Sequence, residues 1–182
     1  MKCIVFFLAI LASPLSAASF DFNLLPSDGA ISGTAGSTIG WGYSITNPSS
    51  AEWLVLSGLN VAPFLAATPN ILFDFPTLKP GSTITESYDS LAGKGLLELL
   101  LSNSIGSTVV NSGEFELTAE WWSGDPFAGG SFVADADAVR ASYQATDTAS
   151  GTPEPGGAVL ALSGVGVLAG GLFVRSRVRK TV

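Results

Sequence analysis

The heptapeptide Ile-Gly-Trp-Gly-Tyr-Ser-Ile, residues 39–45, decides the fold class of this chain. Large apolar side chains occupy every second position, and glycine or serine occupies the positions between them. Because successive side chains of a β-strand point to opposite faces, this alternation puts nearly all the bulk on one face. The pattern predicts a strand whose bulky face lies inside a sandwich and whose small face meets a close neighbour or solvent.

Alternation of the same kind recurs on both sides of this heptapeptide. It is plainest at residues 114–122, where the apolar positions are expected to face inward: Phe115, Leu117, Ala119 and Trp121. Residues 95–102 fit a helical turn as well as a strand, but the run is short and follows glycines, which favours a strand. The remaining strands are expected at residues 20–24, 52–61, 71–75, 83–89 and 139–145.

About eight short strands separated by Gly, Pro and Asn turns predict an all-β protein, an antiparallel β-sandwich. A jelly roll or an open barrel would give the same pattern. The Gly-Ser-Thr turn at 36–38 and the Leu-Lys-Pro-Gly-Ser turn at 78–82 resemble turns of the Ig-like sandwiches of bacterial surface proteins. This resemblance concerns architecture alone.

The two ends of the chain differ in composition from its middle. Lys2, an apolar run at 4–11 and the small residues that end at Ala18 are typical of a signal peptide, so we expect residues 1–18 to be removed. The sandwich domain is then expected at 19–147. From Asp147 to Thr152, no side chain is large enough to anchor in a core, and residues 148–152 are expected to form a linker.

The C-terminal segment, residues 153–180, begins with Pro153, Glu154 and Pro155. Residues 156–174 follow without a charged side chain, and as a helix they would reach roughly 28 Å, close to the thickness of a bilayer core. We therefore expect one transmembrane helix there. Basic residues come next and are expected to stay on the cytoplasmic side: Arg175, Arg177, Arg179 and Lys180.

A Pro-Glu-Pro tripeptide, a hydrophobic span, an Arg-rich tail and an N-terminal signal peptide together resemble the PEP-CTERM sorting signal of Gram-negative bacteria. The resemblance covers about thirty residues. It implies that a membrane-embedded protease, exosortase, recognises Pro153, Glu154 and Pro155 and releases the protein to the cell surface or the extracellular matrix. The family often has valine before the tripeptide, where this chain has Thr152. The alternative is an ordinary single-span anchor with incidental prolines at its start.

The charge of the exported part restricts its partners. Residues 19–152 hold fourteen acidic side chains against three basic ones, Lys79, Lys94 and Arg140, a net charge of −11. We therefore expect no nucleic-acid partner. The simplest interpretation of the acidic side chains is a solvated surface that favours solubility. The alternative is that they bind divalent cations.

The residue types that are missing exclude much chemistry. The chain has no histidine, and its one cysteine, Cys3, lies in the expected signal peptide. The mature domain therefore has no intrachain disulfide, no Cys/His zinc site and no Ser-His-Asp triad. We expect a protein that is not an enzyme and holds no cofactor or metal. Hydrolysis by paired carboxylates remains an alternative, although no motif indicates it.

One loop, residues 121–137, combines aromatic residues with glycines and acids. Exposed aromatic rings stack on sugars, and loop carboxylates bind calcium, so this loop is the candidate ligand site: Trp122, Asp125, Asp135 and Asp137. The simpler interpretation is a long connection in which Trp121 belongs to the core and Trp122 covers the sheet edge.

The resulting hypothesis is an exported, non-enzymatic sandwich with a structural or adhesive role at the cell surface or in the biofilm matrix. It would be held in the inner membrane with its domain in the periplasm before exosortase acts, and an exopolysaccharide is the candidate extracellular partner. The alternative functions are a carbohydrate- or calcium-binding module and a carboxylate-based hydrolase.

Overall fold

The computed structural model describes residues 19–103 and 105–149, and this part of the chain is all-β, without a helix. The predicted signal peptide, residues 1–18, and the predicted sorting segment, residues 153–180, lie outside the described residues. The strands are β1 (Asp21–Leu25), β2 (Ala30–Thr34), β3 (Thr38–Thr46), β4 (Trp53–Val61), β5 (Ala67–Ile71), β6 (Thr77–Leu78), β7 (Thr83–Glu86), β8 (Leu97–Leu101), β9 (Val109–Trp122), β10 (Phe132–Asp135) and β11 (Val139–Thr148).

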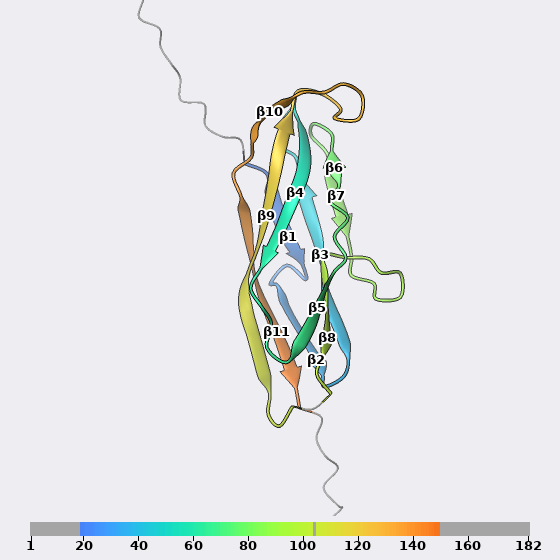
Figure 1. Cartoon of the computed structure of the whole chain (residues 1–182), viewed down its shortest axis with the longest axis vertical. Coiled ribbons are helices and arrows are strands. Elements are labelled where there is room, and N and C mark those ends of the chain that lie inside the picture. The colour runs from blue at the N-terminus through green and yellow to red at the C-terminus, as the bar shows by residue number, and fades with distance from the viewer. Residues whose placement is uncertain (1–18, 104, 150–182) are drawn as a thin grey trace, which may run out of the picture. The chain divides into compact units, whose positions relative to one another are not determined.

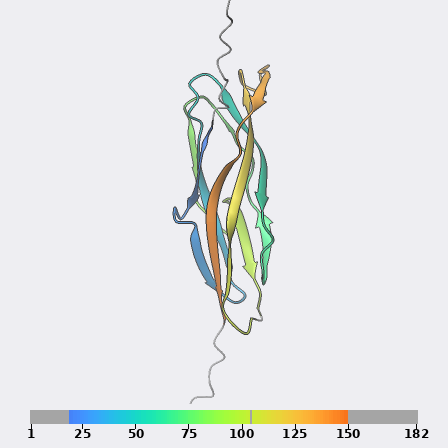
Figure 2. The same ribbon diagram turned by 90° about the vertical axis from the view of Figure 1, so that its left-hand side faces the viewer.

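The strands form two sheets that face each other as a sandwich (Figures 1 and 2). The five-stranded sheet has the order β1-β3-β8-β5, with β7 also paired to β3. The six-stranded sheet has the order β2-β11-β9-β4-β6, with β10 also paired to β9. Strand β9 runs alongside both β4 and β11, so it is the centre of its sheet.

The core lies between the sheets and is built from the alternating residues of both. In β9 the predicted inward residues Phe115, Leu117, Ala119 and Trp121 are all buried, as expected. In β3 the predicted bulky face is buried at Trp41, Tyr43 and Ile45. The rings of Trp41, Phe115 and Tyr143 pack together with centroids 4.7–5.3 Å apart, which joins the two sheets.

The small face of β3 has a close neighbour, as its sequence predicts. A Cβ at Gly40 would lie 2.4 Å from the Tyr88 ring, and one at Gly42 would lie 2.4 Å from the Glu86 carbonyl oxygen. Only glycine therefore allows residues 86–88 to cross this face of the strand.

Strands β7 and β8 follow one another along the same direction beside β3. Glu86 is opposite Tyr43, and Leu97 is opposite Trp41, so the residues between Glu86 and Leu97 are an insertion between two strands that both pair with β3. Backbone hydrogen bonds in both directions between Asp89 and Lys94 close this insertion into a loop, and its Leu91 is 99% exposed.

Several sequence predictions are confirmed and others are wrong. The ambiguous run at 95–102 is a strand, β8. The sandwich is not wholly antiparallel, because β2 pairs in parallel with β11. The strand expected at 71–75 lies earlier, at β5, because Phe75 has a φ of 54°, which a strand does not allow. Strands β2, β6 and β10 were not predicted.

The end of the domain also differs from its predicted position. Strand β11 continues to Thr148, which had been assigned to the linker 148–152, and Asp147 is buried rather than solvent-facing. The reason is pairing on both sides: Asp147 lies opposite Val109 of β9 and Gly33 of β2. Hydrogen bonding of the backbone extends the strand although the side chains are small or polar.

One buried amide fixes the loops at the end of the sandwich where β3 ends. The Asn47 Nδ2 donates to the carbonyl oxygens of Glu52, Leu78 and Lys79 at 2.9–3.2 Å. Its Oδ1 accepts from the Ser49 amide at 2.9 Å, and the residue is fully buried. Asn47 thereby ties together the connections that follow β3 and β6.

Replacing this amide should destabilise the whole domain. We expect Asn47→Ala to lower the free energy of unfolding by about 2–3 kcal/mol, because three carbonyl groups lose their donor. Asn60→Ala is the matched control, since Asn60 makes one 3.4 Å contact on the outer face and should change stability by less than about 0.5 kcal/mol. Urea unfolding measures both, and equal stabilities would contradict the role of Asn47.

Candidate functional site

Three large aromatic side chains lie in a row on the outer face of the six-stranded sheet. Trp53 of β4 is directly opposite Trp122 of β9, which is directly opposite Phe132 of β10. Directly opposed residues of antiparallel strands share one face of the sheet. Trp121, the residue before Trp122 in β9, points to the other face and is buried in the core. Trp53, Trp122 and Phe132, here called the aromatic row, therefore point away from the core.

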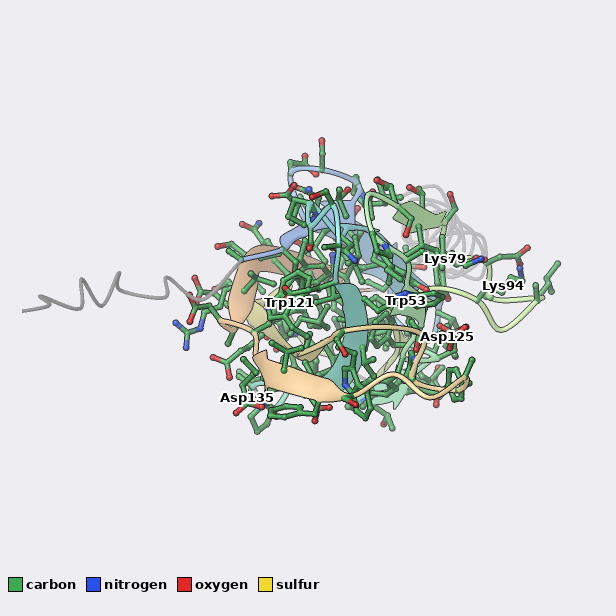
Figure 3. The ribbon with its side chains drawn as sticks, turned by 90° about the horizontal axis from the view of Figure 1, so that it is seen from above. Trp53, Lys79, Lys94, Trp121, Asp125 and Asp135 are labelled. Atoms are coloured by element: carbon green, nitrogen blue, oxygen red, sulfur yellow. The ribbon has the colours of Figure 1, made fainter. Side chains whose placement is uncertain are left out.

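The rings of the aromatic row are fixed by polar groups. The Trp122 Nε1 donates to the Glu120 Oε2 at 3.0 Å. The Lys79 ammonium lies 5.8 Å from the centroid of the Trp53 ring, and Figure 3 shows Lys79 beside Trp53. The rings of Trp122 and Phe132 are 6.4 Å apart and nearly perpendicular, at 86°. The two rings are thus not stacked face to face.

Carboxylates continue along the same face of β9. Glu120 is opposite Asp135 of β10, and Glu114 and Glu116 follow further along the strand. Arg140 pairs with Glu116, and its Nε also lies 3.9 Å from Glu114. Hydrogen bonds from Arg140 and Asn60, and the charge of Arg140, lower the pKa of Glu116.

The residues of the predicted ligand loop do not gather at one point. The Asp125 Oδ1 accepts from the Phe127 amide at 2.9 Å, and its carbonyl oxygen accepts from Ala128 and Gly130, so Asp125 shapes the loop itself. Asp135 lies on β10, and Figure 3 shows it well apart from Asp125. Asp137 follows β10 and is exposed.

Of the four predicted residues, Trp122 and Asp135 do lie on one surface, as the cross-strand pairing of β9 and β10 requires. Among the described residues, no group of three or more His, Cys, Asp or Glu side chains is arranged to hold a metal ion.

A second polar site lies at the edge of the sandwich beside β7. It is a pocket of about 150 Å³ that includes Tyr43, Asp74, Glu86 and Lys94 in its lining. The Tyr43 hydroxyl donates to the Asp74 Oδ1 at 3.4 Å, and Lys94 pairs with Glu86 at 3.1 Å. Burial, and then the charges of Asp74 and Glu86, raise the pKa of the Tyr43 hydroxyl, which therefore stays protonated.

In this pocket two carboxylates, Asp74 and Glu86, lie near one another, as the hydrolase alternative requires. Each carboxylate, however, has a partner within the chain: the tyrosine hydroxyl for Asp74 and the lysine ammonium for Glu86. The arrangement is a network of one hydrogen bond and one ion pair, which favours a structural role at the sandwich edge over a pair of acid and base.

Sequence reasoning missed Trp53, Phe132 and Asp147. Trp53 and Phe132 join the site through the register of strand pairing, which brings residues 53, 122 and 132 side by side. No local pattern in the sequence indicates this register. Asp147 is 1% exposed, and neither carboxylate oxygen has a hydrogen-bond partner. Asp147 continues the alternation of the inward residues Tyr143 and Ala145, and this pattern could have predicted its burial.

No protein-family model matches the chain, and no curated protein matches it either. The part of the chain that the structure describes contains no helix of the length and apolarity that a membrane crossing requires. The predicted sorting residues Pro153, Glu154 and Pro155, and the basic residues that start at Arg175, lie outside the described residues.

Removing the buried charge should stabilise the domain at neutral pH. Burial raises the pKa of Asp147, so the folded state favours the protonated acid. The contribution of Asp147 to the free energy of unfolding therefore falls with rising pH. The fall begins near pH 3.9, about the pKa of an unfolded aspartate, and continues through the higher pKa of Asp147 in the folded state. We expect Asp147→Asn to raise stability at pH 7 by about 1 kcal/mol or more and to have little effect at pH 3.

Thermal melts at both pH values measure this difference, with Asp137→Asn as the exposed control. A melting temperature for Asp147→Asn at pH 7 equal to or below that of the wild type would show that the buried carboxylate is not destabilising.

Chelation should leave the domain unchanged. Because Asp125 is used within its loop and lies apart from Asp135, we expect EDTA or added calcium to shift the melting temperature by no more than about 1–2 °C. Differential scanning calorimetry checks this. A larger rise with calcium would instead favour the calcium-binding alternative and implicate Asp125, Asp135 and Asp137.

Proposed function

We propose that this chain is an exported, exosortase-processed protein of the cell surface or extracellular matrix, whose sandwich is a non-enzymatic adhesive domain. The sorting part of the proposal is supported by the resemblance of Pro153, Glu154 and Pro155, with the span and basic tail behind them, to the PEP-CTERM signal. The signal-peptide pattern at residues 1–18 supports export.

The strand order supports an Ig-type domain. Ig sandwiches have sheets of the order ABED and CFG. The orders β1-β3-β8-β5 and β4-β9-β11 follow the same scheme, with β1, β3, β4, β5, β8, β9 and β11 as A to G. The parallel pairing of β2 with β11 is an addition to that scheme. Sandwiches of this type commonly present loops at one end for binding.

One observation carries the adhesive role: the aromatic row and Thr148 lie at opposite ends of the sandwich. Strand β9 ends at Trp122, whereas Asp147 of β11 is paired with Val109, where β9 begins (Figure 1). The sorting signal starts at Pro153, five residues after Thr148. Attachment through the C-terminal segment would leave the aromatic row at the outer end of the domain, accessible to extracellular partners.

Changing Pro153, Glu154 and Pro155 together to alanine should block processing and leave membrane insertion intact. Insertion and orientation depend on the span at 156–174 and the basic tail behind it, which are unchanged. In a host that has exosortase, the variant should accumulate at full length in the membrane fraction, while the wild type is found as a shorter species at the surface or in the medium.

The control is the triple change Ser150→Ala, Gly151→Ala and Thr152→Ala, which alters the adjacent linker and should be processed normally. Immunoblots of membrane, surface and medium fractions distinguish the outcomes. Equal cleavage of wild type and the motif variant would remove the tripeptide from the proposal, and the absence of any cleavage would favour the plain-anchor alternative.

A further inference from the structure

The aromatic row forms a partly exposed apolar strip on a sheet face on which most side chains are polar. Phe132 is 52% exposed, Trp53 and Trp122 are half-buried, and Phe127 in the loop after Trp122 is 87% exposed. Single exposed aromatic residues are common, but adjacent ones at one end of a domain mark interaction sites.

The row is rigid before any ligand arrives. Trp53 and Trp122 are the pair at the end of the β4–β9 ladder, and the hydrogen bond to Glu120 fixes the tilt of the Trp122 ring. The loop that carries Phe127 is closed by its own backbone hydrogen bonds, including Ser123 to Ser131 at 2.9 Å. Little conformational entropy is therefore lost when something binds here.

The groups next to the row are hydrogen-bond acceptors. Glu120 and Asp135 lie in the adjacent cross-strand position, and ionised carboxylates can only accept. A ligand suited to this surface has apolar C–H faces for the rings and many hydroxyl donors for the carboxylates. Sugar rings have both features in one unit.

The negative charge of the domain favours some sugar polymers over others and disfavours other kinds of polymer. The exported part has a net charge of −11, so anionic polysaccharides and nucleic acids are repelled. Two of the chain's own cations already lie on this face, Lys79 over Trp53 and Arg140 on Glu116, and they would compete with a cationic ligand at those positions. A neutral ligand remains as the best match.

We propose that the aromatic row binds a neutral polysaccharide, with sugar rings packed on Trp122 and Phe132 and hydroxyl groups donating to Glu120 and Asp135. This inference rests on the proposed function, since a surface-displayed domain is the one that meets extracellular glycans. The inference specifies the class of ligand, a neutral polysaccharide. It also places the site on the three strands β4, β9 and β10 instead of on one loop.

The test uses the full-length protein in lipid nanodiscs and neutral glucans of different linkage: cellohexaose, laminarihexaose, maltohexaose and dextran. Polygalacturonate and polylysine are the charged comparisons. Isothermal titration and tryptophan fluorescence should show binding of at least one neutral glucan, with an affinity that changes little between 0.05 and 0.5 M salt, because the ligand carries no charge.

Phe132→Ala and Trp122→Ala should each weaken that binding by about tenfold or more, since each loses a stacked ring. Leu91→Ala is the control, because Leu91 is also apolar and is more exposed than either ring, but lies on the insertion of the other sheet, so the affinity of this variant should equal that of the wild type. Circular dichroism and melting temperatures confirm that the variants are folded, and Phe132, on an edge strand, is the safer of the two changes.

The proposal is overturned if none of the four glucans binds at millimolar concentration, or if Phe132→Ala binds as well as the wild type. It is also overturned if only polylysine binds, in a salt-sensitive manner, or if the aromatic variants change the oligomeric state and nothing else. Binding by purified protein is independent of cell fractionation, so failure here is distinguishable from failure of the sorting proposal.

Discussion

The indole of Trp41 is the contact on which the sandwich depends. Its Nε1 donates to the Gly29 carbonyl oxygen at 2.8 Å, and its ring packs edge-on against Phe115 and Tyr143. Gly29 has a φ of 67° and lies where the chain leaves the five-stranded sheet to form β2 in the other. A Cβ at Gly29 would lie 2.2 Å from the Ser142 carbonyl oxygen, so the crossing requires glycine.

This single residue connects three features that are distant in sequence. Strand β3 supplies Trp41, β9 and β11 supply the rings around it, and the β1–β2 crossing supplies the hydrogen-bond acceptor. A buried indole N–H needs a partner, so the sheet crossing and the aromatic core each fix the other. The facing arrangement of the two sheets is built around this point.

Alternation predicted the strands that bury one face, because burial on one side imposes a period of two on the sequence. It failed where the pairing is distant or the strand is exposed. Strand β2 has one large side chain, Ile31, and exists because β11 pairs with it. Residues 71–75 alternate well, but the strand is β5, whose Pro69 is tolerated at the edge of its sheet.

The candidate site was harder to predict for the same reason. Trp122 and Asp135 could be selected because aromatic and acidic residues in a glycine-rich loop are conspicuous. Trp53 is distant in sequence from them, and only the pairing of β4 with β9 brings it alongside Trp122. Asp125 was selected on equal grounds and instead holds the loop backbone. Residue type indicated a loop of interest, whereas register decides which of its members act together.

The two-sided pairing of β11 has a mechanical consequence. Strand β9 holds β11 on one side and β2 holds it on the other, up to Thr148, and these hydrogen bonds lie across the strand direction. A pull on Thr148 directed away from the aromatic row loads them in shear, so that many share the force at once instead of opening one after another. The domain can therefore transmit tension between Thr148 and the end that carries the aromatic row while it remains folded.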